Sequence, residues 1–135
     1  MAIEDSPKIK KAFPLPFKGK LVGDGLFKLL APFEYRNPPV LIKVPTDFIT
    51  DGASIPSFAY SLIGGRWTGK YVRAAIVHDY GYFFQTMTRK EVDDIFLEGM
   101  EILGVPLLNR WIMYKCVRMV AWIFWNKVKK EKEVI

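Results

Sequence analysis

The residues of this sequence best suited to chemistry are a histidine, three aspartates and a serine. His78 and Asp79 are adjacent, Asp93 follows further along the chain, and Asp51 and Ser54 lie together in an earlier segment. Histidine transfers protons near neutral pH, a carboxylate can orient it, and a serine can then act as the nucleophile of a hydrolase. A histidine with two or three carboxylates could instead hold a hard divalent metal ion and its water. The sequence leaves the metal unknown and shows no cofactor motif.

A structural role for the same residues is the alternative. A lone histidine near aspartates often belongs to a fully satisfied hydrogen-bond network inside the core, here one that would tie a loop to two helices. With one histidine in the chain, a zinc site built from several imidazoles is excluded. The phosphate-binding glycine motifs of nucleotide enzymes are also absent. An enzyme site and a structural network therefore both remain open.

Two predicted helices position most of these residues. Residues 70–84 are almost wholly apolar, which predicts a helix that is buried on most sides and carries His78 and Asp79. An unpaired buried carboxylate is costly, so the partners of Asp79 must come from elsewhere in the fold.

The next helix distinguishes between two adjacent aspartates. Thr88 and Glu91 have the spacing of a capping box, which predicts a helix from there to about residue 103. At 100° per residue, Asp93 flanks the apolar face of this helix, whereas Asp94 points to solvent. The residues expected to converge at one place are Asp51, Ser54, His78, Asp79 and Asp93.

The elements indicate an α+β fold, with a small N-terminal antiparallel β-meander followed by about three to four helices. Residues 33–36 alternate between apolar and polar, and Val40, Ile42 and Val44 share one face of a following strand, so residues 19–50 form the predicted meander. We expect a basic extended arm at 1–18, a single α+β domain at 19–130 and a charged tail at 131–135. The one cysteine excludes an internal disulfide.

Several ordered motifs carry a family resemblance. They are residues 44–56 (VPTDFITDGASIP), 71–82 (YVRAAIVHDYGY), 89–96 (RKEVDDIF), 104–106 (GVP) and 110–111 (RW). Together they resemble the signature of domain-of-unknown-function family 1353, over residues 26–118. The family pattern also falls on Tyr82, which joins the five residues above as a candidate. The resemblance implies a phage or prophage origin but no established activity.

A last predicted helix, residues 107–130, has two different faces. One is aliphatic and suits a core, while the other mixes basic and aromatic side chains, a combination typical of interfaces. The candidate binding face consists of Arg110, Trp111, Tyr114, Lys115, Arg118, Trp122 and Trp125. Such a face also suits stacking on nucleic-acid bases or lying on an anionic membrane surface, which are the weaker alternatives. The structural alternative is that the aromatic side chains pack inward against the N-terminal arm. The uncharged runs are far shorter than the roughly 20 residues of a membrane-spanning helix.

Charge is concentrated at both ends of the chain. The net charge is +6, with five basic and two acidic residues in 1–20 and seven basic and two acidic residues in 110–135. Basic ends indicate an acidic partner, a nucleic acid or an anionic membrane surface, and termini that only aid solubility are the alternative. We expect a viral or host protein partner, with a homo-oligomer also open. The N-terminal residues lack the apolar stretch of a secretory signal, which predicts a location in the host cytoplasm or the virion.

Two functions follow as alternatives. The first is a small hydrolase-like enzyme centred on His78. The second is a non-enzymatic phage component of the head or tail, or a partner-binding protein, that acts through the last helix.

Overall fold

The chain divides into two compact units. The computed structural model describes residues 5–23, 25–52, 54–56, 58–59 and 70–133. The first unit is Met1–Asp51 and the second is Gly52–Ile135. The boundary falls where the sequence changes from strand-like to helix-like patterns, within the region 19–130 that we expected to be a single domain.

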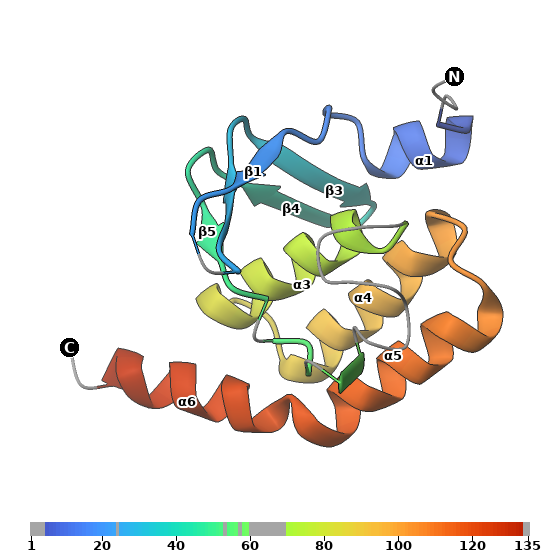
Figure 1. Ribbon diagram of the computed structural model, residues 1–135. Helices are drawn as coiled ribbons and strands as arrows, with labels where there is room; N and C mark the ends of the chain where they lie inside the picture. The colour runs from blue at the N-terminus through green and yellow to red at the C-terminus, as the bar shows by residue number, and fades with distance from the viewer. Residues whose placement is uncertain (1–4, 24, 53, 57, 60–69, 134–135) are drawn as a thin grey trace. The chain divides into compact units, whose positions relative to one another are not determined.

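The first unit contains two small antiparallel sheets (Figure 1). Strands β1 (Gly19–Leu21), β2 (Phe27–Leu29) and β5 (Ile49–Thr50) form one sheet in the order β1-β2-β5. Strands β3 (Phe33–Asn37) and β4 (Val40–Val44) form the other. The expected antiparallel strands, followed by helices, are confirmed, and the α+β class with them.

The alternating pattern of β3 and β4 determines which side chains are buried. Phe33 pairs with Val44, and Tyr35 pairs with Ile42, so these four side chains lie on one face of the ribbon. All four are buried, whereas Leu41 on the opposite face is exposed. Ile42 and Val44 belong to the set of three that the sequence placed on one face of β4, and the third member, Val40, is half-buried.

The expected extended arm contains a helix. Helix α1 (Pro7–Ala12) begins with Ser6, whose side chain accepts a hydrogen bond from the backbone N–H of Ile9 at 3.3 Å. A serine at the cap and a proline at the first helical position are strong start signals, which explains why this segment is not extended. Phe13, just after the helix, stacks on Phe33 with ring centroids 5.7 Å apart.

The second unit is built from helices α3 (Val72–Phe84), α4 (Arg89–Ile102), α5 (Leu107–Val120) and α6 (Trp122–Glu133). Helix α3 is buried along most of its length, as its apolar sequence predicted. Helix α4 begins with the predicted capping box of Thr88, with both reciprocal hydrogen bonds present. Residues 131–133, expected to be a tail, belong to the end of α6.

The last predicted helix is two helices, not one. Helix α5 ends at Val120 and α6 starts at Trp122, with a bend at the buried residue Ala121. Two interactions account for the bend. Helix α5 packs against α4, whereas α6 packs against α3. In addition, the side chain of Arg89 donates hydrogen bonds to two carbonyl oxygens in the last turns of α5, and a side chain inserted there commonly bends a helix.

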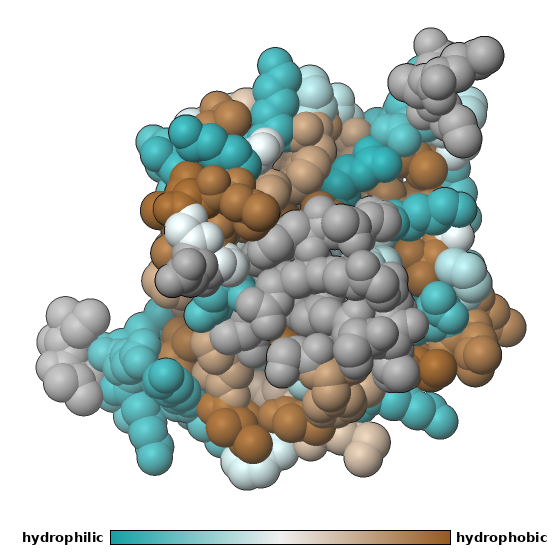
Figure 2. Space-filling view, viewed as in Figure 1, coloured by the Kyte–Doolittle hydropathy of each residue, from teal (hydrophilic) through white to brown (hydrophobic). Residues whose placement is uncertain are grey.

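Not every apolar side chain is covered. Figure 2 shows hydrophobic residues exposed on the visible face, including along its lower edge. Among the most exposed large apolar residues are Leu107, Leu108 and Met119 on α5, and Ile123 on α6. Within the described segments, no helix is long and apolar enough to cross a membrane.

Candidate functional site

His78 lies at the centre of a buried polar network in the second unit. Its Nδ1 is 3.0 Å from the Oγ of Ser54, and its Nε2 is 2.7 Å from the Oδ1 of Asp93. The rings of Tyr82 and Phe96 pack around the imidazole, with centroids 4.4 Å and 4.7 Å away. Ser54, His78 and Asp93 are at most 1% exposed. The network thus lies inside the apolar core.

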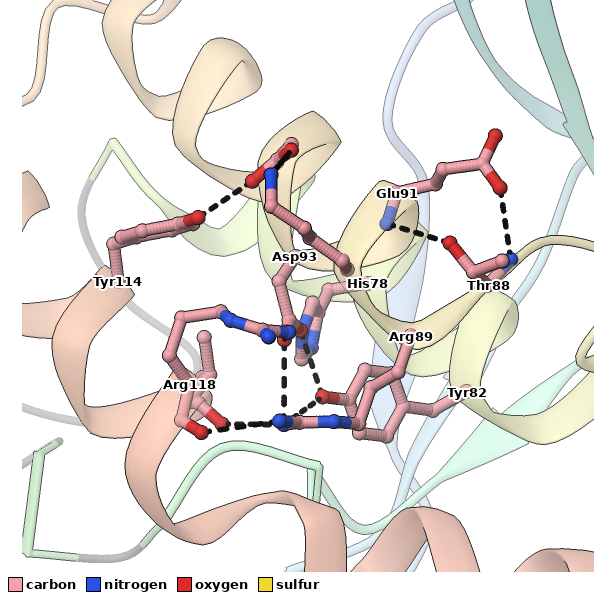
Figure 3. A network of polar contacts seen from close by, with 11 residues as sticks. His78, Tyr82, Thr88, Arg89, Glu91, Asp93, Tyr114 and Arg118 are labelled. Carbon is pink, nitrogen blue, oxygen red and sulfur yellow. Dashed lines mark hydrogen bonds and ion pairs between the residues drawn. The ribbon is translucent and has the colours of Figure 1, made fainter.

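Helical spacing places these side chains together. His78 and Tyr82 are four residues apart on α3, and Arg89 and Asp93 are four residues apart on α4. Side chains at this spacing lie on one face of a helix, one turn apart. The facing sides of α3 and α4 therefore each supply two members of the network (Figure 3).

Asp93 receives a hydrogen bond or ion pair from four side chains. Its Oδ1 accepts from the Tyr82 hydroxyl at 2.7 Å as well as from His78. Its Oδ2 is 2.8 Å from Arg118 and 3.4 Å from Arg89. Two guanidinium groups and two uncharged donors compensate the buried carboxylate, as a charge in the core requires.

Burial and hydrogen bonding determine the protonation states. Burial lowers the pKa of His78 despite the opposing effect of Asp93, so the imidazole is neutral near pH 7. Burial raises the pKa of Asp93, but hydrogen bonds from His78, Tyr82 and Arg118 outweigh it and leave that pKa below its ordinary value. Because an ionised Asp93 can only accept, His78 Nε2–H donates to it and Nδ1 accepts from the Ser54 hydroxyl.

This order of donors and acceptors resembles the relay of a serine hydrolase. Serine donates to one imidazole nitrogen, and the other nitrogen donates to a carboxylate. A hydrolase also needs its nucleophile to reach a substrate carbonyl. Ser54 is 1% exposed and His78 is 0% exposed. In this structure the relay is closed to substrate.

The network does not fit a metal ion. The two oxygens of Asp93 are occupied by His78, Tyr82 and two arginines. A divalent cation would lie beside two guanidinium charges. Across the described parts of the chain, no group of three or more His, Cys, Asp or Glu side chains is placed to hold a metal.

Four of the six predicted site residues meet in this network, namely Ser54, His78, Tyr82 and Asp93. Asp79 is also buried, 4% exposed, but it follows His78 directly on α3. Consecutive helical side chains point about 100° apart, so Asp79 leaves the helix in a different direction from His78. Asp51 is exposed and is the last residue of the first unit.

Arg89 is a member of the network that the sequence analysis missed. One of its nitrogens contacts Asp93 and the Tyr82 hydroxyl, each at 3.4 Å. The same guanidinium donates to the backbone carbonyls of Val117 and Arg118, each at 3.1 Å. The available signal was the i,i+4 spacing of Arg89 and Asp93 on one helix.

Most side chains of the predicted binding face make contacts within the protein. Arg118 is bound to Asp93, and Arg110 donates to the carbonyl of Val105 at 3.0 Å. Tyr114 donates to Asp94. The ring of Trp125 meets that of Tyr82 edge-on, with centroids 5.0 Å apart. The members left exposed are Trp111, Lys115 and Trp122.

The fold and its buried network define a small α+β protein in which one buried carboxylate, Asp93, connects the helices of the second unit. The family model described as "Protein of unknown function (DUF1353)" matches residues 27–117. The chain therefore belongs to this family of proteins of unknown function. No solved structure matches it.

Two relatives come from Sinorhizobium fredii (strain NBRC 101917 / NGR234). Uncharacterized protein y4jT is 36% identical over 109 residues, which cover 78% of this chain and 32% of that protein. Uncharacterized protein y4iH is 38% identical over 68 residues, which cover 50% of this chain and 28% of that protein. The chain thus spans about a third or less of the length of these relatives.

Proposed function

We propose that this chain is a non-enzymatic binding module that acts through the exposed surface of α5 and α6. The observation that carries the proposal is the burial of the network: its serine, histidine and aspartate are at most 1% exposed. The side chains of the second unit that could carry out chemistry are buried, whereas several large apolar side chains of α5 and α6 are exposed to solvent. The Ser54–His78–Asp93 network is then a structural lock rather than an active site.

The lock connects the elements that carry the exposed surface. Asp93 on α4 binds Arg118 on α5, and Arg89 on α4 binds two carbonyls near the end of α5. Gln85, at the end of α3, donates to the carbonyl of Trp125 on α6 at 2.9 Å. These contacts hold α5 and α6 in place, and a pre-organised surface binds a partner at lower entropic cost.

The surface itself has the composition of a binding site. We call it the α5–α6 surface and define it by Leu107, Leu108, Trp111, Lys115, Met119, Trp122 and Ile123. Its six apolar members are between 43% and 72% exposed. Scattered exposed apolar residues are ordinary, but a series along adjoining helices marks an interaction site. A virion location or a phage partner is compatible with this role.

Site-specific photo-crosslinking in expressing cells tests the proposal. A photoreactive amino acid replaces Met119, and the matched control carries it at Leu41, which is 50% exposed in the first unit. The proposal predicts covalent adducts to one class of partner, whether protein, nucleic acid or lipid, from position 119 and not from position 41. Equal labelling at the two positions, or none at either, would contradict it.

A hydrolase-like enzyme is the second candidate, favoured by the ordered Ser54–His78–Asp93 relay. It requires an open state in which Ser54 reaches solvent. In that case His78→Ala should abolish an activity while the protein stays folded. Under the binding proposal, the same substitution acts only through stability.

A further inference from the structure

The bend between α5 and α6 carries three exposed apolar side chains. We call them the apex: Met119 is 72% exposed, Trp122 is 49% exposed and Ile123 is 57% exposed. They lie on both sides of the buried Ala121. Figure 1 shows the bend as the outward corner of the α5–α6 pair, where the two helices meet at the lower edge. The apex thus projects from the helical unit.

The helical periodicity explains why the apex faces outward. Along α5, Met113 and Val117 are buried, and Met119 lies more than 100° around the helix from both. Along α6, the buried residue is Val128, and Trp122 and Ile123 lie on the opposite side of that helix. The buried residues Met113, Val117 and Val128 pack α5 and α6 into the core, and the three apex side chains lie outside that packing.

Lysines lie on both sides of the apex. Lys115 is exposed on α5, and Lys127, Lys129 and Lys130 are exposed on α6. Trp122 and Ile123 line a surface groove together with Lys127 and Lys130. Residues 110–135 carry a net charge of +5, and the two arginines of this stretch are bound inward, to Val105 and Asp93. The free positive charge around the apex therefore comes from lysines.

The exposed apolar side chains and the neighbouring lysines together favour one kind of binding partner over others. Two copies of the chain meeting at the apex would bring two groups of lysines together, which is unfavourable. Nucleic acid would satisfy the lysines and stack on Trp122, but it offers nothing comparable to Met119 and Ile123. An anionic bilayer surface accepts all three parts: tryptophan at the headgroup level, aliphatic side chains at the acyl boundary and lysines beside lipid phosphates.

We infer that the apex and its flanking lysines dock this protein onto an anionic membrane surface. Met119, Trp122 and Ile123 enter the boundary between headgroups and acyl chains, while Lys115, Lys127 and Lys130 contact the phosphates. The inference rests on the proposed binding function and names its partner as lipid.

Vesicle co-sedimentation of the full chain tests the inference. The protein should bind vesicles of phosphatidylcholine with about 30% phosphatidylserine, bind pure phosphatidylcholine vesicles at least about tenfold more weakly, and lose affinity as salt rises. Trp122→Ala should weaken binding about tenfold. Lys127→Glu combined with Lys130→Glu should do so by at least as much. Lys20→Glu, an exposed charge reversal in the first unit, should change it less than twofold.

The variants are compared only after their unfolding midpoints match that of the unmodified chain. The inference is overturned if the chain does not bind anionic vesicles at low salt, or if Trp122→Ala and the lysine reversals bind like the unmodified chain. Protein or nucleic-acid adducts from position 119 without vesicle binding would also overturn it, yet would leave the proposed binding function standing. No adducts and no vesicle binding would contradict both.

Discussion

At the scale of single residues, Asp93 organises the helical unit. Its carboxylate is contacted by four side chains, which come from α3, α4 and α5. The Asp93 carboxylate is 0% exposed, so its charge is stable in the core only when its partners are present. Removing either side of such an ion pair leaves an uncompensated buried charge, which destabilises the fold. Its neighbour Asp94 binds Lys90 at 2.6 Å at a site where both side chains are well exposed. The two adjacent aspartates should therefore contribute very differently to the free energy of unfolding.

Asp93→Asn should lower the free energy of unfolding by about 3 kcal/mol or more, because it leaves Arg118 and Arg89 without a full counter-charge. Asp94→Asn, the matched control, should cost less than about 1 kcal/mol because its ion pair is exposed to solvent. Denaturant unfolding of both variants measures the difference. Equal losses would contradict the structural lock.

The network also predicts how stability depends on pH. Folding lowers the pKa of His78 below its ordinary value of 6.5. As the pH falls below that value, the unfolded chain takes up a proton that the folded chain resists, so folding becomes less favourable. The stability contribution of a neutral His78 is therefore complete above pH 6.5 and is lost progressively below it.

Unfolding curves between about pH 7.5 and 5.5 should show this loss, since no other side-chain type normally titrates there. His78 is the one histidine of the chain, so the assignment is direct. His78→Gln should be less stable at neutral pH and should show a flatter pH dependence. A variant with an unchanged slope would mean that His78 is not the group responsible.

Part of this network was predictable from the sequence at the scale of single residues. The helical wheel separated Asp93 from Asp94 because amphipathic periodicity is encoded in adjacent positions. The roles of Arg118 and Tyr114 were not predictable in the same way. On a wheel both belong to a basic aromatic face, and the packing of α5 against α4 turns them toward Asp93 and Asp94.

At the scale of elements, the close approach of α3 and α4 depends on a glycine. Gly81 is buried on α3, and a Cβ at that position would lie 2.6 Å from Cγ1 of Val92 on α4. Contacts that short force neighbouring atoms to move. The missing side chain at residue 81 lets the two helices bring His78 and Tyr82 within reach of Asp93.

Gly81→Ala should therefore destabilise the protein by about 1–3 kcal/mol through steric overlap, although alanine favours helix. Val92→Ala makes room for the added methyl group. The double variant should be more stable than the sum of the two single losses predicts, as a double-mutant cycle measures. Additive losses would show that the Gly81–Val92 contact does not set the helix spacing.

The limits of individual elements were predictable where local signals were strong. The capping box at Thr88 placed the start of α4, and the alternation in β3 and β4 placed their buried faces. The helix at Pro7 was missed because prolines and alternating phenylalanines nearby favoured an extended segment over the Ser6 cap. The bend at Ala121 has no local signal, since it arises from packing against two other helices and from Arg89.

At the scale of the whole chain, the residues that the sequence marks as candidates for catalysis are not the residues that the fold exposes to solvent. The histidine and aspartates attract attention in the sequence, yet folding places Ser54, His78 and Asp93 out of reach of solvent. The same folding leaves Leu107, Leu108 and the apex exposed. Family membership extends over most of the chain, and relatives of greater length contain the same region. The proposed binding function is supported by the burial of the first group of side chains and the exposure of the second.

The most direct test of this account is whether Ser54 is a reactive nucleophile. A fluorophosphonate probe is attacked by activated serines with loss of fluoride, whatever the natural substrate is. The folded protein is incubated with the probe, and the mass of the intact chain is measured. We predict no adduct on the folded protein. A stoichiometric adduct on Ser54 that disappears in His78→Gln would contradict the account and establish the relay as an active site.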